Sequence, residues 1–337
     1  MQDASGALVL APLTPDRYEL GEGVGEVPVI AFYCAGTGLT KFDRRSGGAP
    51  FGNFWPLPSM IAIEHDGIRS KFSNSEAAYQ AFKWWHHEDT RRAFERCDAP
   101  SLQGGEQAVM LKRRCENDAA LSEQKVSNMA GLGKFDAMLL VLRAKWRLPG
   151  LRELLCGSAG CLLVEHAAEK GRDPYWTDDF SGGGQNRLGA ALMLVRDELL
   201  AEAGEPSAWP SKVPRPSWAG GTDGADADVR WQRMIDELAP QLVRADAKPR
   251  AGTWLQRFSQ LAFWAIMAGI FAAAYIQGEA FGADKESATI IGATIGVASF
   301  FAWLAVDEED DDEAEDEQGA AGEDEVTMGV SEKDKQE

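Results

Sequence analysis

Residues 173–196 read Asp-Pro-Tyr-Trp-Thr-Asp-Asp-Phe-Ser-Gly-Gly-Gly-Gln-Asn-Arg-Leu-Gly-Ala-Ala-Leu-Met-Leu-Val-Arg. An acidic, aromatic segment passes through three glycines into apolar residues at helical spacing, so we predict a helix from near Asn186 to about Leu200. A Gly-rich loop that opens a helix directs backbone N–H groups and the positive end of the helix dipole to one point, which suits a phosphate. We therefore expect a pocket in which Trp176 and Asp178 lie beside an anion-binding loop.

The residues before this stretch predict an α+β domain. Residues 29–34 are apolar and β-prone, and residues 61–65 lead into an Asp66-Gly67 turn, so we predict a strand at each place and a loop at 36–52. Short strands followed by many helices favour a mostly helical α+β domain with a small N-terminal sheet, spanning residues 28–203. Helical periodicity occurs at 77–85, 90–94, 105–115, 135–146, 151–156 and 162–169.

The segments that flank this domain differ from it in composition. Residues 1–27 are rich in Gly, Pro and acidic types, and we expect an irregular extension there. Residues 204–253 have the composition of a linker, with one short amphipathic helix at 229–238. Residues 307–337 hold 16 acidic residues and two lysines, a net charge of −14, which leaves −5 of the total of −19 for the rest of the chain. The acidity therefore belongs to a tail that we expect to be disordered.

Two uncharged segments precede the acidic tail. A helix that crosses a bilayer needs ~20 apolar residues, and residues 258–276 and 288–306 come close to this length. Four basic residues crowd the approach to the first segment, whereas the loop 277–287 has one. The positive-inside tendency therefore predicts a two-pass transmembrane hairpin with the folded domain and the tail in the cytoplasm. The alternative is a pair of buried core helices.

Several classes of site find no support in the sequence. His86 and His87 are adjacent, so on a helix their side chains point about 100° apart and rarely bind one metal ion together. The glycines at 182–184 do not match GxGxxG, and the five cysteines include no CxxC pair. We therefore predict reduced thiols, no metal and no redox cofactor.

A second candidate for function is the segment Glu76-Ala-Ala-Tyr-Gln-Ala-Phe-Lys83. Glu76, Tyr79 or Gln80, and Lys83 fall near one face of a helix, because seven residues make about two turns. A carboxylate at the start of a helix and a lysine two turns later can line a polar pocket. As an alternative, Ser73 caps this helix and Glu76 completes a capping box, and Lys83 is a solvated surface residue.

Five motifs in this order together resemble the NADAR family, over roughly residues 29–200. The resemblance implies an N-glycosidase that splits a base from phosphoribose in riboflavin-pathway intermediates, or that removes ADP-ribose from guanine bases in nucleic acid. It implies no metal or redox cofactor. The motifs are Asn53-Phe-Trp-Pro, Ser73-x-Ser-Glu-x-x-Tyr-Gln-x-x-Lys, Leu142-Arg-Ala-Lys-Trp, Leu163-Val-Glu-His and Tyr175-Trp-x-Asp-x-x-x-x-Gly-x-x-Asn-Arg-Leu-Gly.

The resemblance also assigns site residues. Glu76 and Lys83 fall on the family's helix-start glutamate and its lysine, and Trp176 and Asp178 fall on its Trp-x-Asp pair. The family often places a tryptophan ahead of the Leu-Arg-Ala-Lys helix, whereas residues 128–134 carry none here. The full set of expected substrate-binding residues is Asn53, Tyr79, Lys83, Trp176, Gly182, Gly183, Gly184, Asn186 and Arg187.

The expected chemistry needs two carboxylates. Cleavage of an N-glycosidic bond develops positive charge on the sugar and requires a water at the anomeric carbon, so one carboxylate stabilises the cation and the other activates the water. We predict Glu76 and Asp178 for these roles, in either order. Two alternatives remain: a catalytically inert module that binds ADP-ribose or NAD-like ligands at a membrane, and a structural partner domain of a membrane complex.

Overall fold

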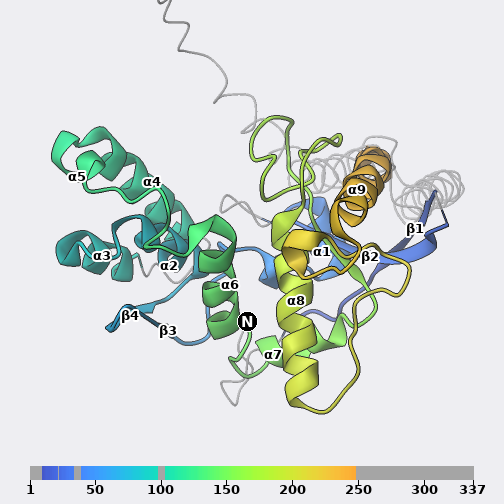
Figure 1. Ribbon diagram of the computed structural model, residues 1–337, viewed down its shortest axis with the longest axis horizontal. Coiled ribbons are helices and arrows are strands. Elements are labelled where there is room, and N and C mark those ends of the chain that lie inside the picture. Colours follow the sequence, from blue (N-terminus) through green and yellow to red (C-terminus); the bar gives the residue numbers. More distant parts are fainter. Residues whose placement is uncertain (1–9, 22, 34–38, 98–102, 248–337) are drawn as a thin grey trace, which may run out of the picture. The chain divides into compact units, whose positions relative to one another are not determined.

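The computed structural model describes residues 10–21, 23–33, 39–97 and 103–247 (Figure 1). The chain divides into two compact units, Met1–Lys248 and Pro249–Glu337, and all described residues belong to the first. A three-stranded sheet has the order β1 (Asp16–Leu20), β2 (Gly25–Phe32), β5 (Leu162–Glu165). β1 pairs with β2 in the antiparallel sense and β2 with β5 in the parallel sense.

Helices and a hairpin complete the unit. The hairpin consists of β3 (Ile61–His65) and β4 (Ile68–Phe72). Short 3-10 helices lie at Ala49–Phe51 (η1), Phe82–Trp84 (η2) and Ser217–Ala219 (η3). The α-helices are α1 (Lys41–Ser46), α2 (Ser75–Ala81), α3 (Glu88–Glu95), α4 (Gln103–Asn117), α5 (Ala119–Glu123), α6 (Gly133–Lys145), α7 (Leu151–Gly157), α8 (Arg187–Glu202) and α9 (Gly224–Ala247).

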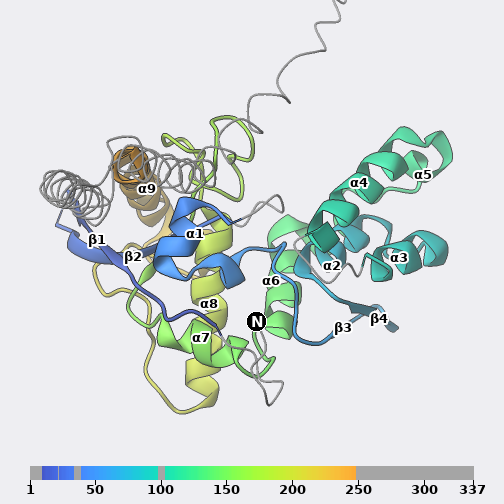
Figure 2. The same cartoon turned by 180° about the vertical axis from the view of Figure 1, so that it is seen from behind.

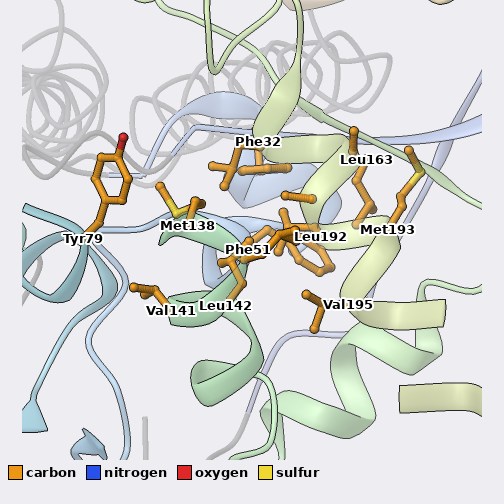
Figure 3. Packing of buried hydrophobic residues seen from close by; sticks show 14 of the residues in the cluster. Phe32, Phe51, Tyr79, Met138, Val141, Leu142, Leu163, Leu192, Met193 and Val195 are labelled. Carbon is orange, nitrogen blue, oxygen red and sulfur yellow. The ribbon is translucent and has the colours of Figure 1, made fainter. Parts of the chain in front are cut away.

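The core lies between the sheet and the paired helices α6 and α8. Seen from behind, α2 to α5 and the hairpin lie on one side of α6, and β1 and β2 with α1 and α9 lie on the other (Figure 2). Phe51 and Leu142 meet Leu192 between α6 and α8, and all three are fully buried (Figure 3). Since β2 and β5 are covered on their faces, both read as apolar runs.

Local sequence explains the elements that the patterns predicted. The turn of the hairpin has φ of 50° at Asp66 and 72° at Gly67, the left-handed conformations that a two-residue hairpin turn needs. α8 begins at Arg187, directly after Asn186, which confirms the predicted helix start. α2 is capped by Asn74, whose side chain accepts a hydrogen bond from the N–H of Ala77, and not by a serine.

Three segments differ from their predictions. Residues 162–169 were expected to be helical, but β5 occupies Leu162–Glu165, because a short apolar run has no periodicity that separates a buried strand from a helix. The extension expected at 1–27 contains β1. The loop expected at 36–52 contains α1, and Asp43 is buried as its capping-box residue, where it accepts bonds from Thr40.

The segment expected to be a linker belongs to the folded unit. Trp231 and Leu238 of α9 are buried in the same core cluster as Leu20 of β1. Arg196, fully buried in α8, donates hydrogen bonds from its guanidinium to Ser158 O (2.6 Å) and Ala208 O (2.9 Å), which ties the start of this segment to α8. The folded unit therefore continues well past residue 203.

The predicted transmembrane hairpin and two-pass membrane location are corrected here. A bilayer-spanning helix needs ~20 apolar residues, whereas α8 has 16 residues and the 24-residue α9 alternates core positions with charged ones. Within the described part of the chain, no helix is long and apolar enough to cross a membrane. The two predicted segments, 258–276 and 288–306, and the acidic tail at 307–337 lie outside the described residues. Over the described residues, the fold class that the structure supports is an α+β domain.

Candidate active site

The candidate site lies at the carboxyl ends of β2 and β5. Phe32 pairs with Glu165, and the N–H of His166 donates to Phe32 O at 2.9 Å, so Tyr33 and Glu165 leave the sheet at the same edge. The carboxyl edge of parallel strands is a common place for ligands in α/β proteins. The charge of Glu76, in the first turn of α2, acts on Glu165 at this edge, and the loop 173–186 between β5 and α8 bonds to Glu165 through Asp178 and Asn186.

Glu76 lies in the first turn of α2 and is buried. Its Oε1 accepts a hydrogen bond of 2.5 Å from Gln80 Nε2, and Gln80 Oε1 in turn accepts one of 2.6 Å from Lys83 Nζ. Burial raises the pKa of Glu76 above its usual value, although the Gln80 hydrogen bond and the Lys83 charge oppose this. The predicted Glu76 and Lys83 are therefore joined through Gln80 in one chain of hydrogen bonds.

Glu165 is a site residue that the sequence prediction missed. It is the last residue of β5, and its Oε2 is buried without a hydrogen-bond partner in the described structure. Burial raises its pKa well above the usual value, and the negative charges of Asp173, Glu76, Asp178 and Asp43 add to this. A carboxyl group in such surroundings favours the protonated state. Glu165 belongs to the Leu-Val-Glu-His motif, and this motif is the sequence feature from which it could have been selected.

Asp178, predicted to be catalytic, has partners within the chain for both carboxylate oxygens. It is fully buried, and its Oδ2 lies 2.6 Å from His166 Nδ1. Its Oδ1 accepts hydrogen bonds from the N–H groups of Ala167 (3.1 Å) and Phe180 (3.0 Å). Asp178 thereby joins the segment after β5 to the loop before α8, and it is already satisfied by three donors.

Asp173 is a further carboxylate that the prediction left out. Its Oδ1 accepts a hydrogen bond from the N–H of Trp176 at 3.2 Å. Burial raises its pKa, and its charge acts on both Glu76 and Glu165. Carboxyl groups from α2, β5 and the loop thus form one electrostatically coupled group.

The side chain of Asn186 is structural where a ligand contact was predicted. Its Oδ1 accepts from the N–H of Glu165 (3.0 Å), and its Nδ2 donates to Leu163 O (2.9 Å). The residue is fully buried with φ of 46°. Both polar ends of the amide are therefore used to join the start of α8 to the open edge of β5.

The N–H groups of the predicted anion-binding loop have partners within the chain. The N–H of Gly183 donates to Asp236 Oδ1 of α9 at 2.7 Å, that of Gly184 to Asp178 O at 3.3 Å, and that of Gln185 to Pro174 O at 2.8 Å. Gly184 also permits a close approach, since a Cβ there would lie 2.3 Å from Thr177 O. Three N–H groups of the loop are therefore bonded within the chain, one of them to a carboxylate of α9.

Aromatic side chains connect α2 to the loop. The ring of Trp176 meets the ring of Tyr79 edge to face at 5.6 Å and that of Tyr175 at 4.8 Å. Arg187, at the start of α8, lies over Tyr175 with 4.7 Å from its Cζ to the ring centroid. The structure thus brings Tyr79, Trp176 and Arg187 together as expected, through Tyr175.

Two lysines bring positive charge to α2. Burial and the charge of Lys112, on α4, lower the pKa of Lys83 to about 8. Lys112 lies 3.7 Å from Glu116.

Asn53, predicted to bind substrate, contacts α2 and α6. Its backbone oxygen accepts a hydrogen bond from the N–H of Glu76 at 3.2 Å, and its Nδ2 lies 3.6 Å from the sulfur of Met138. Among the residues that the structure describes, no group of three His, Cys, Asp or Glu side chains is arranged to hold a metal ion.

Comparisons with known proteins identify relatives of the chain. No protein-family model matches the chain. It is 32% identical to the N-glycosidase YbiA of Escherichia coli over 192 residues, which is 56% of this chain and 99% of that protein, and 32% identical over 189 residues to that of Shigella boydii, with the same two shares. The NMR structure of E. coli YbiA is 29% identical, covers 58% of this chain and 96% of its own, and has a TM-score of 0.38.

Proposed function

Because the chain belongs to the family of the N-glycosidase YbiA, we propose that it hydrolyses the bond between a base and a phosphoribosyl or ADP-ribosyl group. The substrates in view are riboflavin-pathway intermediates and ADP-ribosylated guanine. The observation that carries the proposal is the carboxyl group of Glu165 at the end of β5, whose Oε2 is buried without a hydrogen-bond partner among the described residues and whose pKa is raised in part by the charge of Glu76.

The two carboxyl groups divide the work of hydrolysis. Glu165, whose surroundings most favour the protonated form, donates its proton to the base nitrogen as the C1′–N bond breaks and the bond electrons move to that nitrogen. Glu76 stabilises the sugar cation and takes a proton from the water whose oxygen bonds to C1′. Burial raises the pKa of Glu76, and the Gln80 hydrogen bond and the Lys83 charge act against this, so these two neighbours favour the ionised form that this role needs.

Asp178 acts by positioning in this proposal, in place of the catalytic role predicted for it. Its bonds to His166 and to the N–H groups of Ala167 and Phe180 fix the segment that follows Glu165. Trp176 and Tyr79 offer the base an aromatic surface. The substrate is a small molecule, or a modified base of a nucleic acid.

The test is hydrolysis of a phosphoribosylamino-pyrimidine, and of ADP-ribosylated guanine, by the full chain. Glu76→Gln and Glu165→Gln should each lower kcat by about 10²- to 10⁴-fold while the protein stays folded, because each removes one proton-transfer group. Full activity in both variants would refute the roles, and ligand binding without turnover in the wild type would favour the inert ligand-binding module.

A further inference from the structure

Arg187 is held between two aromatic rings. Its guanidinium carbon lies 4.7 Å from the ring centroid of Tyr175 and 4.3 Å from that of Trp218, and its Nε donates to Gln185 Oε1 at 2.6 Å. A guanidinium stacked on aromatic faces keeps the N–H groups of its edge available for hydrogen bonds. The side chain is therefore fixed in direction without being neutralised by those contacts.

Trp218 is itself fixed from two sides. Its ring meets Phe135 of α6 edge to face at 5.4 Å and Trp231 of α9 at 6.1 Å. The 3-10 turn that carries it is tied to α9, since the N–H and the hydroxyl of Ser217 both donate to Asp228 at 2.6 Å. The ring of Trp218, which packs on Arg187, is thus fixed by contacts with α6 and α9.

The charges around Arg187 favour an anion. Lys134 Nζ also lies over the ring of Tyr175, 5.3 Å from its centroid. No acidic side chain of the described segments forms an ion pair with Arg187. A planar guanidinium presents paired donors that match the oxygens of a phosphate group.

We infer that Trp218 is a positioning residue that holds Arg187 against Tyr175 for the phosphate of the substrate. Trp218 follows the last motif of the family resemblance by 29 positions in the sequence. The segment after α8 would then complete the substrate site as well as the core. This inference rests on the proposed function for the identity of the ligand, and its test is a binding measurement that needs no turnover.

The experiment compares the binding of ribose 5-phosphate and of ribose to the full chain by calorimetry. Trp218→Ala should weaken the binding of ribose 5-phosphate by on the order of 10-fold, the range of a cation–π contact, and leave that of ribose unchanged. Trp218→Phe should restore most of the affinity, because it restores an aromatic face. Trp209→Ala is the matched control: this tryptophan of the same segment packs on Arg215 and Trp231.

A double variant separates positioning from simple loss of structure. In Arg187→Ala, the further change Trp218→Ala should have no additional effect on ribose 5-phosphate, since the side chain that it positions is gone. Additive losses, equal losses for ribose, or unchanged affinity in Trp218→Ala would overturn the inference. If Trp218→Ala does not fold, Trp218→Leu keeps the bulk without the aromatic face and carries the same expectation. Absent turnover with intact phosphate binding would count against the proposed function alone.

Discussion

The loop between β5 and α8 and the segment around α2 both bury polar groups at the candidate site, but they satisfy them differently. In the loop, Asp178 accepts three hydrogen bonds and both ends of the Asn186 amide are bonded. Around α2, burial raises the pKa of Glu76 and lowers that of Lys83, and the nearby Glu165 has a buried oxygen without a partner. The buried polar groups of the loop are fully hydrogen-bonded and hold its conformation. The region around α2 instead contains buried titratable groups with shifted pKa values, which are suited to proton transfer with a substrate.

The largest effect on stability is expected in the loop. Asp178→Ala leaves His166 and two N–H groups without their acceptor, so the free energy of unfolding should fall by about 3–5 kcal/mol. Asp236→Ala removes an exposed carboxylate with a bond to Gly183 and should cost less than about 1 kcal/mol. Urea denaturation of both variants measures the difference. Equal stabilities would show that the buried network is not what holds the loop.

The close approach at Gly184 gives a smaller effect in the same region. In Gly184→Ala the new methyl group would meet Thr177 O at 2.3 Å and backbone atoms of Asp178 and Asp179. The loop has to shift, which should cost about 1–3 kcal/mol. Gly157→Ala is the control, because nothing lies within 4 Å of its Cβ position. Thermal unfolding followed by circular dichroism compares the two; a stable Gly184→Ala protein would contradict the rigid-loop interpretation.

The smallest effect concerns Lys83. Its pKa is lowered to about 8 in the folded protein from an unperturbed 10.5. Between these values the unfolded chain binds more protons than the folded one, so wild-type stability should rise with pH across this window. Lys83→Met removes that contribution, and its stability relative to wild type should fall as pH rises from 8 to 10.5. Parallel stability curves for the two proteins would place Lys83 in solvent.

Periodicity predicted the parts of the fold that depend on local sequence. α8 starts where its apolar repeat begins, and the Asp66-Gly67 turn joins two strands. β5 was predicted as helix from the periodicity of residues 162–169, and the pairing that makes its four residues a strand comes from β2, far away in sequence. α9 was underestimated for the same reason, since its core face is defined by contacts with β1.

The site could be predicted only in its outline. The structure joins Glu76 to Lys83 through Gln80 and brings Tyr79, Trp176 and Arg187 together through Tyr175, and their roles toward a substrate stay predictions. In the proposed function the catalytic role passes from Asp178 to Glu165, because Asp178 receives two backbone donors and Glu165 Oε2 has no partner among the described residues. No spacing in the sequence reports which carboxylate receives backbone donors. Trp218 lies outside every motif and reaches Arg187 through the tertiary fold.

The Asn186 amide has a consequence for how this sheet behaves toward other chains. β5 is an edge strand, and unpaired edge groups are templates for pairing with another molecule. Asn186 takes up Leu163 O and the N–H of Glu165, and the N–H of Asp178 takes up Glu165 O at 3.0 Å. The Asn186 side chain and the Asp178 N–H thereby form hydrogen bonds that a neighbouring strand would otherwise make with this edge of β5. The edge nearest the candidate active site is closed to aggregation by β-strand addition.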